Sequence, residues 1–274
     1  MFIGDRLCAH SSRRILLLFY LPIFPRAAIH LFMNCILFPE NQPMVLERGN
    51  PKLEHIVKVL RTKDGGEIYA GNVNGSLKVC TVSFTNDGGA KLTPVRDIAV
   101  PDQLRAGVAV SFARPQIAQR LLFEAACFGV QNLVFYPASK GEADYAKSSL
   151  YTSGEYKKWL ERGAEQACAT QIPNFKYAAS LEDAIEKLDD MGDPNAVKFA
   201  PDPYEAEFPF IDAYNSYNPV KDEFMNIILG SERGFTNDDR DVLRSKNYTL
   251  ISLGNRILRT DTALIAVLSL LTSA

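Results

Sequence analysis

Two glycine-containing loops near the C-terminal end of the chain carry the residue types best suited to hold a small molecule. The first, residues 229–235, reads Leu-Gly-Ser-Glu-Arg-Gly-Phe, and the second, residues 253–263, reads Leu-Gly-Asn-Arg-Ile-Leu-Arg-Thr-Asp-Thr-Ala. Each follows a short apolar run typical of a strand and precedes a predicted helix. In an α/β protein such loops lie at the carboxyl ends of the strands, where ligands bind. We therefore expect the two loops to form one pocket.

This pocket would be built largely of backbone. Gly230, Gly234 and Gly254 let main-chain N–H and C=O groups approach a ligand closely, and such groups can read an adenine edge and a ribose. Four apolar side chains of the same loops would supply its walls: Leu229, Leu253, Ile257 and Leu258. The alternative interpretation is that the glycines only make turns, while the last two of these side chains belong to the core.

Other chemistries find little support in the residues. Neither G-x-G-x-x-G nor G-x-x-x-x-G-K-[ST] occurs, so a dinucleotide fingerprint and a P-loop are not indicated. The five cysteines are far apart and contain no C-x-x-C, which argues against a zinc site or a disulfide framework and fits a reducing compartment. His55 is the only histidine after residue 30, so a histidine-activated nucleophile and a metal site are both improbable.

The charge and the first residues of the chain set further limits. A formal net charge of −2 over 274 residues means that any binding of nucleic acid must rely on a local basic surface. Residues 15–24 form an apolar run that is too short to span a bilayer and is followed by no convincing cleavage site. We expect translation to start at Met33 and residues 1–32 to be a non-native extension.

Residues 33 to about 100 are expected to be rich in strands. Glu67–Gly71 and Lys78–Phe84 have the β-branched and aromatic composition of strands, and Asn74-Gly75 and Asp87-Gly88 are hairpin-turn signals. A short amphipathic helix is predicted at Leu53–Leu60. A small barrel is the expected outcome.

From Gly107 onward, strands and helices alternate. The predicted strands are residues 108–113, 133–136, 196–200, 226–230 and 248–252. Five helices are predicted. The first begins at Pro115 and ends near Gly129, and the second covers residues 154–169. The third follows a cap at Ser180, the fourth follows a cap at Thr236 or Asn237, and the fifth covers Asp261–Leu271 after a cap at Thr260. Residues 201–221 are expected to be a loop. This alternation predicts an α/β domain with a mostly parallel sheet covered on both faces.

The two glycine loops also resemble the signature of a known family, the RsmE ribosomal RNA methyltransferases. That family has G-P-E-G-G-F in the first loop and L-G-x-R-I-L-R-x-E-T-A in the second. The matching residues are Gly230, Glu232, Gly234, Phe235, Leu253, Gly254, Arg256, Ile257, Leu258, Arg259, Thr262 and Ala263. Upstream, residues 55–61 match H-x-x-x-V-L-R, and Glu165-Gln166 matches the start of E-Q-S-x-R.

The resemblance implies a fold and an activity. It implies a PUA-like, RNA-binding barrel at residues 33–103 and a SPOUT methyltransferase domain at 104–274, in which the chain end forms a trefoil knot, an exception to the rule against knots. The family uses S-adenosyl-L-methionine (SAM), works as a homodimer without a metal or a membrane, and is cytoplasmic. Its reaction methylates N3 of a uridine in 16S rRNA of the small ribosomal subunit. Thr262 and Ala263 join the expected cofactor-binding residues on this basis.

Three departures from the family pattern fall on its basic positions. Ala169 stands where E-Q-S-x-R has arginine, Glu124 stands where a lysine is usual, and residues 139–142 lack an expected arginine. The motif residues expected to bind the cofactor are kept, whereas basic residues expected to face RNA are replaced. A non-catalytic RNA- or ribosome-binding relative, or a methyltransferase for a different RNA, therefore stays an alternative.

The expected chemistry points to two side chains. Methyl transfer from a sulfonium needs in-line geometry and an electron-rich nitrogen, and a cation can stabilise the charge that spreads over the uracil oxygens. Arg259 is the predicted cation, unless it only pairs with Asp261 or makes a dimer contact. Glu232 would orient the base or accept the proton, unless it caps the following helix.

For RNA docking we expect four residues of the first region to act together: His55, Lys58, Arg61 and Lys63. Such side chains position RNA through its phosphates without reading sequence, although a solvated helix face would look similar. Tyr145, Tyr151 and Tyr156 could stack on a flipped base, but core packing is the alternative for most of them.

Overall fold

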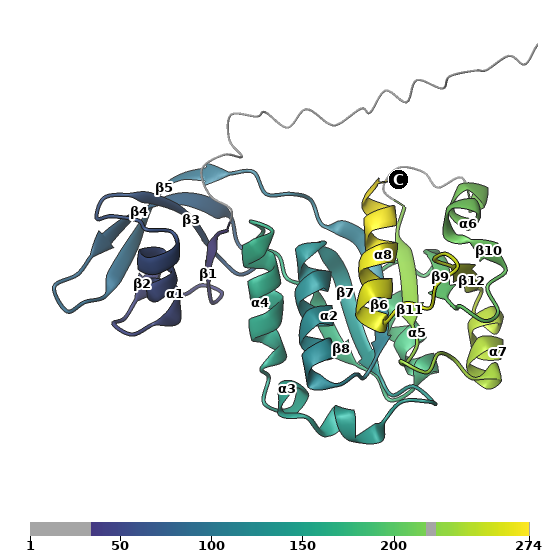
Figure 1. Ribbon diagram of the computed structural model, residues 1–274. Coiled ribbons are helices and arrows are strands. Elements are labelled where there is room, and N and C mark those ends of the chain that lie inside the picture. Colours follow the sequence, from purple (N-terminus) through teal and green to yellow (C-terminus); the bar gives the residue numbers. More distant parts are fainter. Residues whose placement is uncertain (1–33, 218–222, 274) are drawn as a thin grey trace, which may run out of the picture. The chain divides into compact units, whose positions relative to one another are not determined.

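The computed structural model describes residues 34–217 and 223–273, which form an α/β protein with two sheets (Figure 1). The expected extension, residues 1–32, and the expected start at Met33 lie outside the described residues. No helix within the described ranges is both long and apolar enough to cross a bilayer.

The smaller sheet is built from residues 36–98 in the strand order β1-β3-β4-β5-β2. Its strands are β1 (Ile36–Phe38), β2 (Val45–Leu46), β3 (Glu67–Asn72), β4 (Leu77–Phe84) and β5 (Ala90–Ile98). The predicted strands at 67–71 and 78–84 are confirmed, with antiparallel pairing across the expected turns at Asn74-Gly75 and Asp87-Gly88. Alternate side chains of these strands form one buried cluster that includes Ile68, Cys80 and Val82.

The predicted helix at Leu53–Leu60 starts earlier and changes its winding. α1 (Pro51–Glu54) begins where the Asn50 side chain accepts a hydrogen bond from the Lys52 N–H, and residues His55–Val59 continue as a π-helical turn. Ile56 is fully buried, but Val57 and Val59 are 47% and 63% exposed. Leu53 is also buried and Leu60 packs against the same cluster, so the segment is amphipathic as predicted although its two valines are exposed.

The larger sheet has seven strands in the order β10-β12-β9-β11-β6-β7-β8, and each adjacent pair runs parallel. The strands are β6 (Leu104–Ser111), β7 (Val130–Tyr136), β8 (Asn174–Tyr177), β9 (Val197–Pro201), β10 (Phe208–Pro209), β11 (Met225–Leu229) and β12 (Thr249–Ser252). The central strands are largely apolar, as expected for strands covered by helices on both faces. The predicted parallel α/β sheet is confirmed.

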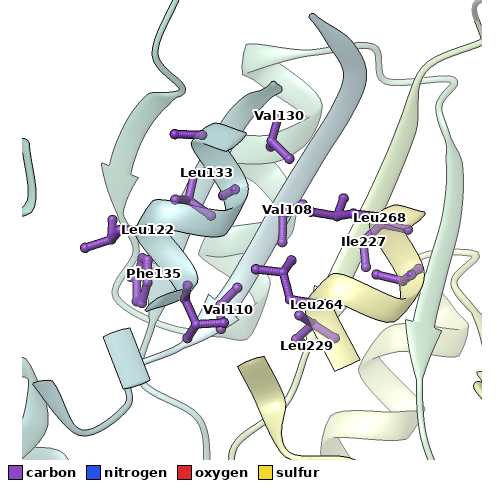
Figure 2. Close-up of a cluster of buried hydrophobic side chains, with 14 of the residues drawn as sticks. Val108, Val110, Leu122, Val130, Leu133, Phe135, Ile227, Leu229, Leu264 and Leu268 are labelled. Carbon is purple, nitrogen blue, oxygen red and sulfur yellow. The ribbon is translucent and has the colours of Figure 1, made fainter. Parts of the chain in front are cut away.

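Three helices bury one face of this sheet: α2 (Pro115–Cys127), α4 (Tyr156–Gln166) and α8 (Thr260–Ser273). Figure 2 shows Leu264 and Leu268 of α8 beside the strand residues Val108 and Ile227, and Leu122 of α2 near Phe135 of β7. Burying each such side chain is worth about 1.5–3 kcal/mol. α5 (Leu181–Met191) and α7 (Asn237–Ser245) cover the opposite face.

Several helix ends follow the sequence signals. Pro115 opens α2, and Gly129, with φ of +71°, follows its end. The Ser180 side chain accepts a hydrogen bond from the Asp183 N–H at the start of α5. Of the two caps considered for α7, Thr236 is the one observed, in a reciprocal capping box with Asp239. Thr260 is the first residue of α8.

The expectation of a plain loop at residues 201–221 is wrong for most of that range. It contains the edge strand β10 and the helix α6 (Phe210–Tyr217), whose Phe210 and Ala213 are buried, while residues 218–222 lie outside the described part. β8 and the short elements η2 (Ala143–Lys147) and α3 (Ser149–Thr152) were also not predicted.

Candidate functional site

Three loops meet at the carboxyl ends of β9, β11 and β12, which are neighbours or near neighbours in the parallel sheet. They line one hollow at this edge of the sheet. Its walls come from the segments 201–204, 229–235 and 251–263. The two glycine loops therefore share one pocket, as the sequence indicated, and a third loop completes it.

Gly254 lines this hollow at a point where the backbone is open. Gly254 has φ of +115°, and no heavy atom lies within 4 Å of the place where a Cβ would stand. The turn is fixed by Ser252, whose Oγ accepts from the Gly254 N–H at 3.1 Å and donates to the Gly254 carbonyl at 3.0 Å. A side chain here would be strained and would project into free space.

A buried ion pair holds the third loop, residues 201–204, in place. The Asp202 carboxylate lies 2.5 Å from Arg240 Nε and also accepts from the Tyr204 N–H at 2.7 Å. Burial acts to raise the pKa of Asp202, but the hydrogen bonds from Arg240 and from backbone N–H groups outweigh it and hold the pKa below its usual value. Tyr204, 63% exposed, is thereby positioned on the wall of the hollow.

The first glycine loop is braced by the loop after β7. Lys140 Nζ donates to the Phe235 carbonyl at 2.7 Å, and Ser139 Oγ donates to Asp239 Oδ1 at 2.7 Å. Phe235 itself is buried, and its ring lies 3.1 Å from where a Cβ on Gly230 would be. Glycine at position 230 lets the strand end pack directly against this ring.

A second, more open hollow adjoins the first. The two share the wall residues Glu232, Ile257, Leu258 and Thr260. The remaining walls of the second hollow are Arg114, Gln116, Ile117, Arg120, Arg259 and Asp261. A molecule in one hollow would therefore lie beside a molecule in the other.

Arginine side chains dominate the charge of the second hollow. Asp261 is 8% exposed in its side chain and is approached from two sides, by Arg120 Nη1 at 3.3 Å and by Arg259 Nε at 3.7 Å. Arg114 Nε donates to the Tyr145 hydroxyl at 2.9 Å, and this hydrogen bond is the main cause that raises the pKa of Arg114. Glu232 adds an exposed carboxylate to the same space.

Comparison with known families identifies the larger domain. Residues 101–272 match the family model of the RNA methyltransferase domain, which is more than half of the chain. The chain belongs to the RNA methyltransferase domain family. The resemblance to RsmE proteins inferred from the two loops is confirmed.

Curated members of this RNA methyltransferase family are similar over most of their length. Ribosomal RNA small subunit methyltransferase E 1 of Borreliella burgdorferi is 25% identical over 236 residues, covering 85% of this chain and 95% of that protein. Ribosomal RNA small subunit methyltransferase E of Treponema pallidum is 24% identical over 249 residues, covering 84% and 87%.

Solved methyltransferase structures share the fold. Ribosomal RNA small subunit methyltransferase E from Neisseria gonorrhoeae, bound to S-adenosyl methionine, aligns with a TM-score of 0.68 at 17% identity, over 88% of this chain and 98% of that chain. A candidate methyltransferase of Legionella pneumophila, in complex with SAM, aligns with a TM-score of 0.71 at 19% identity, with the same coverage.

Most of the predicted cofactor residues line the first hollow of this RNA methyltransferase domain. They are Leu229, Gly230, Gly234, Leu253, Gly254, Ile257, Leu258 and Ala263. Thr262 is not among the lining residues and is exposed in the first turn of α8. Of the predicted catalytic pair, Glu232 lines both hollows, and Arg259 lines only the second.

The four residues predicted to dock RNA lie together on the smaller sheet's helical segment and the turn after it, outside both hollows. Lys58, Arg61 and Lys63 are exposed, and His55 is partly exposed. Lys58 Nζ is 2.9 Å from Glu54 Oε2.

The aromatic residues considered for base stacking mostly pack internally. Tyr151 is buried edge-on against Phe112, and Tyr156 packs on Phe175 with ring centroids 4.4 Å apart. Tyr145 instead accepts the hydrogen bond from Arg114. Core packing, the alternative stated for most of these residues, is what occurs for two of them.

Sequence reasoning missed the third loop and two arginines. Residues 201–204 carry no glycine signal, and only the parallel pairing of β9 with β11 and β12 brings them to the pocket. Arg114 is the N-cap residue of α2 and Arg120 lies within that helix, and both are more than a hundred residues before the glycine loops. Across the described ranges, no group of three or more His, Cys, Asp or Glu side chains is placed to hold a metal.

Proposed function

We propose that the protein transfers the methyl group of SAM to N3 of a uridine in the 16S rRNA of the small ribosomal subunit. The observation that carries this proposal is the pair of adjoining hollows at the carboxyl ends of β9, β11 and β12, in a chain of the RNA methyltransferase family. One hollow has an apolar lining and open backbone suited to a nucleoside, and the other brings cationic groups to its side.

The first hollow fits SAM by the chemistry of its lining. Apolar side chains such as Leu253 and Ile257 would enclose an adenine ring, and the open backbone at Gly254 leaves N–H and C=O groups to read its edge. Leu229, Gly230, Gly234, Leu258 and Ala263 would complete the site. Thr262, exposed next to Ala263 in the first turn of α8, stays a predicted contact. Bound there, SAM would supply an electrophilic methyl group on a positively charged sulfur.

The residues of the second hollow would prepare the uridine. Arg259 would donate hydrogen bonds to a uracil oxygen and stabilise the negative charge that develops there as N3 loses its proton. Glu232, which lines both hollows, would accept that proton or hold the base in line. Asp261 contacts Arg259 and would keep its guanidinium oriented.

Labelled SAM, offered with small ribosomal subunits and with free 16S rRNA in parallel, tests this function. We expect label in RNA, recovered as 3-methyluridine by mass spectrometry of the nucleosides. Label in another nucleoside would indicate a different RNA target. SAM binding without any transfer would indicate a non-catalytic RNA-binding relative.

We propose further that residues 33–103 form a PUA-like barrel that guides RNA, and that residues 104–274 form the SPOUT catalytic domain. The five-stranded sheet and the exposed cations Lys58, Arg61 and Lys63, with His55 beside them, support an RNA-docking role. Exchange of the three cations for alanine should weaken RNA binding without changing affinity for SAM.

The proposed SPOUT domain includes a trefoil knot. Support comes from the path after β12, which lies outside β9 in the sheet, whereas α8 packs on α2 and β11. The connection 253–259 must therefore return past the loops that follow β9 and β11. An experimental structure that traces this connection tests the threading.

A homodimer in the cytoplasm completes the proposal. α8 carries Ile265 and Leu270, each 38% exposed, which is apolar surface suited to a subunit contact. Action on ribosomal RNA would place the enzyme in the cytoplasm.

A further inference from the structure

We propose that Arg114 and Arg120, at the start of α2 and within it, bind the backbone phosphate of the target nucleotide, and that the second hollow is the nucleotide's own site. This inference rests on the proposed function and adds to it the residues that anchor the substrate. Neither arginine belongs to the family motifs described above.

The first argument is the position of the two side chains. Both line the second hollow, which shares the wall residues Glu232, Ile257 and Leu258 with the first. A nucleotide that presents its base to the shared wall would have its sugar and phosphate farther out, where α2 begins. Arg114 directly precedes α2, and Arg120 lies within it.

The second argument is that both guanidinium groups keep donors available. Arg114 is exposed and uses Nε for the Tyr145 hydroxyl, and within the described residues its Nη groups have no hydrogen-bond partner. Arg120 is 67% exposed in its side chain and uses Nη1 for Asp261. A guanidinium that is held at one nitrogen still presents a planar pair of donors that matches two phosphate oxygens.

The third argument is the distribution of charge. The lining of the hollow has three arginines, Arg114, Arg120 and Arg259, and two carboxylates, Glu232 and Asp261. Glu142 and Glu124 act on Arg114 and Arg120 from outside this lining. A phosphate would meet the excess positive charge of the lining itself. The hollow is also open to solvent, so a nucleotide within a longer strand can enter it.

Arg114 and Arg120 supply positive charge near positions where the family pattern has a basic residue and this chain does not. Glu124, which stands where the family has lysine, is one helical turn after Arg120, so α2 retains a cation on the same face. In the loop 139–142 that lacks its arginine, Glu142 accepts a hydrogen bond from Arg233 of the first glycine loop at 2.8 Å. Arg233 thus places a cation beside this loop, although it lines neither hollow.

The test compares Arg114→Ala and Arg120→Ala with Arg105→Ala. Arg105 is also an exposed arginine, but it lies near the start of β6, at the end of the strand away from the hollows, over the Phe224 ring. For each variant, kcat and KM for small ribosomal subunits are measured at several salt concentrations, together with SAM affinity by calorimetry.

We expect each of the Arg114 and Arg120 variants to raise KM about tenfold or more, with a smaller change in kcat and no change in SAM affinity. The slope of log affinity against log salt should fall by about 0.7–0.9 for each phosphate that the variant no longer neutralises. Lysine at either position should restore part of the affinity, and Arg105→Ala should behave as wild type. Unchanged KM and slope in both variants would overturn the inference.

A direct binding assay separates this inference from the proposed function. If the wild-type protein transfers no methyl group to RNA, the proposed function falls. A fluorescent uridine-containing decanucleotide is then titrated in the presence of S-adenosylhomocysteine. Weaker binding by Arg114→Ala and Arg120→Ala than by Arg105→Ala supports the anchor, and equal binding by all three rejects it.

Discussion

Arg259 is exposed and held by a single long contact to Asp261, with Nε 3.7 Å from Oδ1. Most N–H donors of the Arg259 guanidinium are therefore available to a ligand. The ion pair with Asp261, the alternative role considered for Arg259, is compatible with ligand binding. Asp261 is itself nearly buried at the start of α8. The pair therefore has a fixed carboxylate and a guanidinium that reaches into the hollow.

We expect Arg259→Ala to lower kcat for methyl transfer by about 10²–10³-fold, the usual cost of removing one donor to a developing negative charge. SAM affinity should stay within about twofold of wild type, because Arg259 does not line the first hollow. Single-turnover transfer and calorimetry measure the two effects. Normal transfer by this variant would show that Arg259 is not catalytic.

Among the elements, the loop after β9 and the helix α7 are joined by Asp202 and Arg240, whose side chains are 0% and 6% exposed. The pKa of Asp202 is lowered in the folded protein, so its carboxylate stabilises the fold at pH values above its unfolded pKa of about 4. That contribution disappears as the pH falls through the lowered, folded pKa.

Asp202→Asn should reduce the free energy of unfolding at pH 7 by about 1.5–3 kcal/mol, because the buried Arg240 loses its nearest carboxylate and keeps only Glu205, 3.4 Å from its Nη1. The difference from wild type should shrink below about pH 4. Urea unfolding at a series of pH values measures both. Asp144→Asn, which removes an exposed partner of Lys147, is the control and should change little; a pH-independent difference for Asp202→Asn would contradict the assignment.

The contact between α2 and α4 depends on Gly163. A Cβ at this position would lie 2.2 Å from the Phe123 carbonyl oxygen and 2.8 Å from the Ala126 Cβ. Helix propensity alone favours alanine by about 1 kcal/mol, but the backbone clash should dominate. We expect Gly163→Ala to lower the free energy of unfolding by about 1–3 kcal/mol.

Chemical denaturation at neutral pH measures this change, with Lys158→Ala on the exposed side of α4 as control. A stabilised Gly163→Ala variant would mean that the two helices separate easily at this point.

Elements with strong local signals were predictable, and those created by tertiary packing were not. The turn Asn74-Gly75 and the cap Thr236 carry their chemistry in one or two residues, and both are found in place. α6 was missed because a proline- and tyrosine-rich segment has no helical period, and its helix is stabilised by burial of Phe210 and Ala213. The same limit applies to Arg114 and Arg120, which become site residues only when α2 packs beside α8.

For the whole molecule, the proposed homodimer makes a prediction on mass. Sedimentation velocity should give twice the mass of one chain, and Ile265→Asp on α8 should shift it toward the monomer because a carboxylate cannot be buried there cheaply. Ile211→Asp on α6, 49% exposed, is the matched control. A wild-type monomer, or an unchanged dimer in Ile265→Asp, would show that α8 is not the contact.

The strand order of the larger sheet also bears on how fast the protein can fold. β6 pairs with β11, so Val108 and Ile227 are adjacent in space although about 120 residues separate them in the chain. Contacts of such long range are costly in chain entropy before they become favourable, and parallel pairing requires a crossover for every strand. The central strands can therefore join only after β11 has left the ribosome, and until then their apolar surfaces depend on rapid collapse or on chaperones to escape aggregation.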